Sequence, residues 1–379
     1  MNEAALASLR QGQIADACRM FTRALELEPG HATLQANLAQ CLARDGWESL
    51  NRGEIEKARA LFEQGLALIP SDASLLGGLG VVHLRNGDAT QALPLLEEAQ
   101  RVSPASPDLR LRLAQLYLER DDADRAVAHL RAILDREPGH AEALRLLAKI
   151  EREREAEAGY YQDESRHFVI KYRGRDSATR RAVLDGLERA YDRIGRELDV
   201  TPGERMAVIL YPETVFREVT RVHPWAQGLF DGKIRIPVVS EKTEGLDRIV
   251  AHELAHAVIH RLSQGRAPLW LQEGLAQELE GQGEASRLLA LRGLPRSELP
   301  PLDALDSLIR SSEEDHVRRG YLLAWSGVRF LLDRQGIRGV RELLGRLGRG
   351  QPWENAFQSV YGQPFRESSR EWAALLARS

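Results

Sequence analysis

Hydrophobic positions in the first part of the chain recur at the spacing of amphipathic helices, and the whole pattern then repeats. Pro70, Pro104 and Pro138 lie 34 residues apart, and each closes a segment of the same kind. In each segment a helix ends near Gly or Asp, a tight turn follows, and a second amphipathic helix runs up to the proline. This pattern predicts stacked helical hairpins that bury a continuous core between neighbours.

An earlier copy of the segment ends at Pro29, which lies 41 residues before Pro70 and therefore seven residues outside the period. Two extra helical turns around residues 41–50 would absorb the difference, because seven residues return a helix to nearly the same face. Residues 4–157 resemble tetratricopeptide repeats, about four of them, with 141–158 as a charged helix that caps or leaves the array. Such folds leave a concave groove that receives a peptide or partner protein, and we expect this here; a scaffold that only positions the next domain is the alternative.

The pattern changes after Gly159. Residues 166–172 alternate like a strand, residues 178–198 have helical spacing, and residues 206–211 form a short apolar run. Residues 228–238 predict a hairpin that turns at Asp231-Gly232, and everything from Leu246 onward has helical spacing. The sequence therefore predicts an all-α tetratricopeptide solenoid over residues 1–158, followed by an α+β domain over residues 159–379.

Composition narrows the function. Hydrophobic residues make up 43% of the chain and charged residues 28%, which is typical of a soluble globular protein. The net charge of −4 comes without a basic block, so nucleic-acid binding is not expected. No stretch approaches the roughly 18 apolar residues of a membrane span, and the start of the chain lacks a leader pattern, so we expect no membrane contact and a cytoplasmic location. Cys18 and Cys41 are expected to be two buried free thiols rather than a disulfide.

The candidate chemistry lies in His252-Glu253-Leu254-Ala255-His256. Two histidines four apart lie one helical turn apart on one face and can bind a single ion. A catalytic zinc needs three protein ligands and one open position, and Glu253 is placed to take the proton of an attacking water. The apolar residues around the motif favour this reading, because a buried pair of histidines beside a glutamate is costly without a partner such as a metal.

The third ligand must come from outside the motif. A histidine six positions after His256 is excluded because Leu262 lies there. Glu273 fits instead, because residues 264–268 form a turn and residues 269–279 predict an apolar helix antiparallel to the first. His260 continues the spacing, but a fourth protein ligand would close the site, so we expect it to pack or to support a ligand. Gln277 is expected to hydrogen-bond a ligand imidazole.

Residues 160–377 resemble the peptidase MA-like domain, a thermolysin-related branch of the glutamate-type zinc peptidases that is often found in bacteria behind tetratricopeptide repeats. The resemblance lies in these segments: His167 to Ile170, Trp225 to Gly228, Ile234 to Pro237, His252 to His256, Trp270 to Ala276, Gly320 to Ala324, Trp353 to Phe357, Tyr361-Gly362 and Trp372.

This resemblance implies a zincin-like fold and one Zn²⁺ per chain at His252, His256 and Glu273. It also implies Glu253 as the catalytic base and a substrate extended along the strand that ends near Val238. Related enzymes stabilise the oxyanion with a later Tyr or His, for which Tyr321 is the candidate, although a core tyrosine is the alternative.

The expected function is a zinc metallopeptidase that hydrolyses protein or peptide substrates, with the repeats recruiting or orienting the substrate. The alternative is an interaction scaffold with an autoinhibited or inactive peptidase-like domain. A purely structural zinc site is disfavoured, because three ligands leave one position open.

Overall fold

The computed structural model describes all residues except 175–176, 201–204, 223–225, 239–244, 282, 295–298 and 379. It divides into two compact units. The first unit comprises residues 1–118, 122–147 and 348–352, and the second comprises residues 119–121, 148–347 and 353–379. No helix in the described part of the chain is long and apolar enough to cross a membrane.

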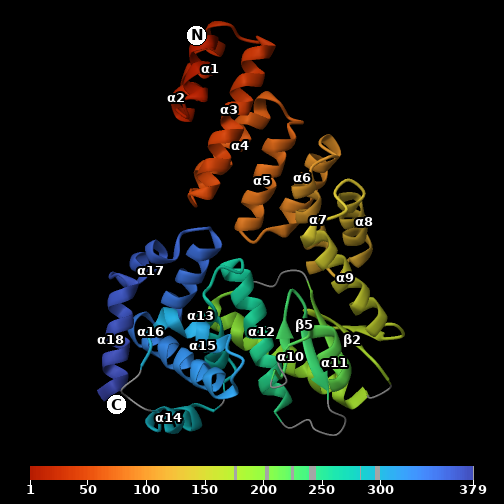
Figure 1. Ribbon diagram of the computed structural model, residues 1–379, viewed down its shortest axis with the longest axis vertical. Coiled ribbons are helices and arrows are strands. Elements are labelled where there is room, and N and C mark those ends of the chain that lie inside the picture. Colours follow the sequence, from red (N-terminus) through yellow and green to blue (C-terminus); the bar gives the residue numbers. More distant parts are fainter. Residues whose placement is uncertain are drawn as a thin grey trace. The chain divides into compact units, whose positions relative to one another are not determined.

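The first unit is a tetratricopeptide-like solenoid of consecutive helix pairs (Figure 1). Its helices are α1 (Asn2–Arg10), α2 (Ile14–Leu27), α3 (Ala32–Asn51), α4 (Ile55–Leu68), α5 (Ala73–Arg85), α6 (Ala89–Val102), α7 (Pro107–Glu119), α8 (Ala123–Leu134) and the start of α9 (Ala141–Ala156). Helix α3 has 20 residues, whereas α5, one repeat later, has 13. The predicted insertion of two turns is confirmed.

The 34-residue period has a local cause at the start of each second helix. Gly87 and Asp121, one period apart, both adopt positive φ angles, of 76° and 59°. Glycine does this without strain, and aspartate is among the few other residues that tolerate it. Asp88 and Asp122 follow, and each carboxylate accepts a hydrogen bond from a backbone N–H in the first turn of the helix that it caps.

The repeats pack through large apolar side chains placed at the same point of each second helix. Phe21, Phe62, Leu96 and Leu130 are all fully buried. The ring of Phe62 lies where Gly46 and Gly78 leave space, since a Cβ atom at either glycine would come within 2.5 Å or 2.4 Å of a ring carbon. The two glycines therefore allow the ring to fill the space between their helices.

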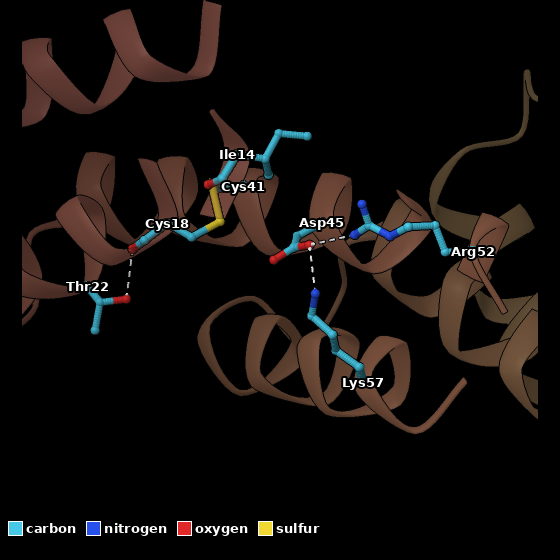
Figure 2. The surroundings of a disulfide bond; sticks show 7 residues. All are labelled: Ile14, Cys18, Thr22, Cys41, Asp45, Arg52 and Lys57. Carbon is cyan, nitrogen blue, oxygen red and sulfur yellow. Dashed lines mark hydrogen bonds and ion pairs between the residues drawn. A yellow bond between two sulfur atoms is a disulfide. The ribbon is translucent and has the colours of Figure 1, made fainter. Parts of the chain in front are cut away.

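Cys18 of α2 and Cys41 of α3 form a disulfide, with Cα atoms 5.5 Å apart (Figure 2). Both residues are buried as expected, but the prediction of free thiols is wrong. Two antiparallel helices bring the side chains face to face, and the 23-residue separation in sequence does not reveal that contact. One turn beyond Cys41, the buried Asp45 pairs with Arg52 and Lys57.

A five-stranded sheet begins the second unit. Its strands are β1 (Tyr161–Glu164), β2 (Phe168–Tyr172), β3 (Met206–Pro212), β4 (Leu229–Phe230) and β5 (Ile234–Val238), in the order β1-β2-β3-β5-β4. Strands β2, β3 and β5 are parallel, and β1 and β4 are antiparallel strands at the two edges. The predicted strands and the hairpin of β4 and β5 are confirmed, whereas β1 was not predicted.

Helices cover the sheet. Alternate strand side chains, including Ile170, Val208 and Ile236, pack with α10 (Ser177–Leu198) and α12 (Leu246–Ser263) in the main core. On the other face, Ile209 and Tyr211 pack with α11 (Glu213–Thr220). This smaller α/β region places α12, which carries the histidine motif, next to β4 and β5 (Figure 1).

The remaining helices of this unit are α13 (Leu269–Leu279), α14 (Glu284–Arg292), α15 (Leu305–Ile309), α16 (Glu314–Gly348), α17 (Trp353–Tyr361) and α18 (Phe365–Arg378). Helix α16 is broken at Gly336, which has a φ of 63°. Trp270 of α13 stacks on Phe365 of α18 and meets Trp353 of α17 edge-on. This aromatic cluster anchors α13 from the side of the later helices.

A buried ion-pair network also belongs to the second unit. The guanidinium of Arg235, which is 1% exposed, hydrogen-bonds Asp231, the Tyr211 hydroxyl and Glu153 of α9. Lys149 pairs with Asp231 at 2.8 Å. The network satisfies a buried charge and fixes the end of α9 to the sheet.

Candidate metal centre

Helices α12 and α13 bring three predicted ligands together. His252 and His256 extend from successive turns of α12, and Glu273 faces them from α13. The two histidine Nε2 atoms lie 3.2 Å apart, and Glu273 Oε2 lies 3.6 Å from His252 Nε2 and 3.4 Å from His256 Nε2. These three residues are the one group in the described part of the chain whose ligand atoms converge in this way.

The separations fit a single zinc ion. Bonds of about 2.0–2.2 Å in a tetrahedral shell place neighbouring ligand atoms about 3.3–3.6 Å apart. Glu273 Oε2 is enclosed, and among the described residues it has no hydrogen-bond partner of good geometry. A buried carboxylate oxygen without a partner is costly, and a cation at the common point of the three ligands would satisfy it.

Local sequence explains how Glu273 reaches the histidines. Helix α12 ends at Ser263, the next two residues, Gln264 and Gly265, both have positive φ, and α13 begins after Pro268. The carboxylate of Asp306 then accepts hydrogen bonds from the first two backbone N–H groups of α13, at 3.1 Å and 2.7 Å. Asp306 was not predicted from the sequence; it fixes the start of the helix that carries Glu273.

The carboxylates and imidazoles of the site shift one another's pKa values. Burial would raise the pKa of Glu273, but the adjacent His256 and His252 lower it to about 2, so this carboxyl is ionised. Burial raises the pKa of Glu253, and the same histidines oppose that effect. Burial lowers the pKa of His252, while Glu273 and Glu280 raise it to about 10. An ionised carboxylate that lies between two imidazoles is a donor set that suits a divalent cation.

The Glu253 side chain packs against the backbone at Gly228, on the side of the site that the sheet forms. A Cβ atom at Gly228 would lie 2.4 Å from Glu253 Oε1 and 2.6 Å from its Cγ. Gly228 directly precedes the edge strand β4, so the carboxylate packs on backbone where any larger residue would displace it. Gly228 belongs to the segment Trp225 to Gly228 that carries part of the family resemblance, but its contact with Glu253 was not predicted from the sequence; Trp225 lies outside the described residues.

The prediction that Gln277 hydrogen-bonds a ligand imidazole is wrong, because Glu280 contacts the His252 ring instead. Glu280 Oε2 lies 3.1 Å from His252 Nδ1. Gln277 donates instead to the backbone carbonyls of Tyr321 and Glu273, at 2.9 Å and 3.2 Å. The signal for Glu280 was its position seven residues after Glu273, which returns to the same face of the helical path after two turns.

Tyr321 lies beside the predicted ligand set. Burial, followed by the Glu273 and Glu253 carboxylates, raises the pKa of Tyr321, so its hydroxyl stays protonated. His260 is not drawn into the site; its ring contacts Phe230 edge-on at 5.5 Å. The structure thus brings together His252, His256, Glu273, Glu253 and Tyr321, and leaves His260 in packing.

Two kinds of family model match the chain. Tetratricopeptide repeat models match residues 2–47, 46–108 and 83–150. The model described as Peptidase MA superfamily matches residues 223–378, which include the motif of α12 and the helices after it. The chain carries tetratricopeptide repeats and a Peptidase MA superfamily domain. The repeats belong to a class that binds peptides or partner proteins.

Curated relatives match over short stretches. Cellulose synthase 1 operon protein C of Komagataeibacter xylinus is 35% identical over 80 residues, which is 21% of this chain and 6% of that protein. Cellulose synthase 2 operon protein C of the same organism is 32% identical over 119 residues, 31% of this chain and 9% of that protein. The chain therefore spans less than a tenth of the length of these relatives.

Solved structures resemble the chain weakly. YrrB, described as a TPR protein with an unusual peptide-binding site, matches with a TM-score of 0.31 and 21% identity, covering 38% of this chain and 70% of that one. MamA from Desulfovibrio magneticus RS-1 matches with a TM-score of 0.28 and 18% identity, covering 37% of this chain and 75% of that one.

Proposed function

We propose that the chain is a zinc-dependent peptidase whose repeats recruit or orient a protein substrate or partner. The observation that carries the proposal is the convergence of His252, His256 and Glu273 at separations of 3.2–3.6 Å, beside the buried carboxylate of Glu253. Three protein ligands leave the fourth position of a tetrahedral zinc open, which is the arrangement of catalytic sites. The match to the Peptidase MA superfamily supports the same class of chemistry.

A zinc ion held by these ligands would supply Lewis acidity, which activates water and polarises a carbonyl group. Glu253, as the carboxylate, would take the proton of the attacking water and then deliver it to the leaving nitrogen. Burial raises the pKa of Glu253, which makes its carboxylate a stronger base for the first of these transfers. Tyr321 would donate a hydrogen bond to the oxygen on which negative charge develops.

The sheet offers a place for an extended substrate. Strand β4 pairs with β5 at Ile234 and Arg235. In the described part of the chain the rest of β5, up to Val238, is paired on the β3 side alone. A peptide that added to this open edge would bind through main-chain hydrogen bonds, which suits a protein substrate.

Zinc analysis and hydrolysis of a peptide library by purified protein test the proposal. We expect about one zinc per chain in the wild type and a loss or weakening of zinc binding in Glu273→Ala. Glu253→Gln should keep the zinc and reduce cleavage by at least about 100-fold, because a positioned general base contributes about 10²–10⁴-fold.

Glu354→Gln, which changes an exposed glutamate of α17, is the matched control and should leave both readouts unchanged. A wild type that cannot hold zinc when supplied would refute the metal site. Undiminished cleavage by Glu253→Gln would refute the assigned base. A wild type that holds zinc but cleaves nothing would favour the scaffold alternative.

A further inference from the structure

A pair of opposite charges, the buried Glu280 and the half-buried Arg287, lies next to His252. Glu280 Oε2 contacts His252 Nδ1 at 3.1 Å, and Glu280 Oε1 accepts a hydrogen bond from Arg287 Nη1 at 2.7 Å. The Glu280 side chain is 7% exposed and that of Arg287 is 14% exposed. The three residues therefore form a continuous chain of contacts from α14 to the metal centre.

We propose that Glu280 and Arg287 are a positioning pair that prepares His252 for metal binding; this inference rests on the zinc site of the proposed function. A neutral imidazole carries its hydrogen on one nitrogen, and the nitrogen without it binds the metal. A carboxylate at Nδ1 holds the hydrogen there, which leaves the Nε2 lone pair facing His256 and Glu273. Glu280 thus selects both the tautomer and the ring orientation of His252.

Arg287 gives Glu280 a fixed position. Besides Glu280, its guanidinium donates to the backbone carbonyl of Gln277 at 2.8 Å and lies over the ring of Trp325 at 5.1 Å. An arginine held at three points presents its donors in one orientation, so Glu280 cannot turn away from His252 without breaking a charge-assisted hydrogen bond.

The pair also connects α14 to the metal centre. Helix α14 has no buried residue, and Leu288 and Leu289 are exposed. Arg287, whose side chain is 14% exposed, links this helix to Glu280, and Glu284 adds a surface ion pair with Arg329 at 3.3 Å. A change in the position of α14 would therefore alter the orientation of His252 through the contacts of Arg287 and Glu280.

The test is zinc affinity, measured by competition with a chromophoric chelator on metal-free protein, together with the visible spectrum of the cobalt-substituted protein. Glu280→Ala should weaken zinc binding by about 10- to 100-fold, because loss of a partner of a ligand histidine has effects of this size. Glu280→Gln can still accept a hydrogen bond from His252 Nδ1 but forms no ion pair with Arg287, so its zinc affinity should fall by less. This variant also tests the proposal if Glu280→Ala fails to fold. Arg287→Ala should also weaken binding, and Arg287→Lys should restore part of it.

Arg292→Ala, which removes an exposed arginine of the same helix, is the control and should bind zinc as the wild type does. The cobalt spectrum should change in Glu280→Ala, because the orientation of one ligand is lost. Wild-type zinc affinity and an unchanged cobalt spectrum in Glu280→Ala would overturn the positioning role while leaving the zinc site intact. A wild type that binds no zinc would overturn both, and a wild type that binds zinc tightly but cleaves no peptide would overturn only the peptidase.

Discussion

Substitution of Gly228 by alanine should slow peptide hydrolysis by about 100-fold while leaving the metal in place. The added Cβ atom would lie 2.4 Å from Glu253 Oε1 and 2.7 Å from its Cδ. Ordinary contacts of carbon begin at about 3.5 Å, so either the carboxylate or the backbone must move by about 1 Å. A displacement of about 1 Å in a catalytic group can cost about 100-fold in rate.

The same clash should destabilise the second unit without unfolding it. Overpacking by one methyl group in a filled site costs about 1–3 kcal/mol, and Gly228 lies in a segment just before an edge strand that can yield in part. We therefore expect Gly228→Ala to fold, to hold zinc like the wild type, and to lower kcat/KM by about 100-fold. The loss should appear mainly in kcat, because the proton transfer and not substrate binding is disturbed.

The assay is hydrolysis of a peptide that the wild type cleaves, measured with zinc content and thermal unfolding on the same preparations. Gly195→Ala is the matched control, since its Cβ would meet Val200 O at an ordinary 3.6 Å. Activity of Gly228→Ala within about threefold of the wild type would refute the reasoning, because it would show that Glu253 tolerates the displacement. Loss of zinc in the variant would show that the clash disturbs the ligands instead of the base.

Two further predictions concern stability. Replacing Cys18 and Cys41 by alanine should lower the unfolding free energy of the first unit by about 3 kcal/mol, since the disulfide closes a loop of 23 residues; a urea titration checks this, and an unchanged midpoint would contradict a role for the disulfide in stability. Burial alone would raise the pKa of Asp231, but the nearby Arg235 and Lys149 lower this pKa by more, so the net shift is downward. Its stabilising effect is therefore complete above the unfolded pKa of about 3.9 and fades as the pH falls through the lower folded value. Asp231→Asn should be less stable than the wild type at pH 7, with the difference narrowing in acid; a constant difference would contradict the assignment.

Much of the fold could be predicted because its signals are local. The 34-residue period is visible in the spacing of glycine, aspartate and proline residues. An insertion of seven residues lengthens one helix without rotating its apolar face away from the core. The strands β2, β3 and β5 were visible as apolar runs. Strand β1 was missed because its residues, Tyr161 to Glu164, are mostly exposed and carry no alternating pattern. The disulfide was missed for a different reason, since the pairing of Cys18 and Cys41 depends on how two helices face each other.

The residues of the candidate site also differ in how far local sequence determines their positions. His252, Glu253 and His256 could be placed because the geometry of one helix converts their spacing directly into a shared face. Glu273 required one further step, the turn between two helices. The Gly228 contact and the Arg287 pairing could not be predicted, because each joins segments whose approach is decided by the packing of the whole domain. The contacts that position the site residues therefore had to be found in the structure, whereas the proposed metal ligands and base could already be named from the sequence.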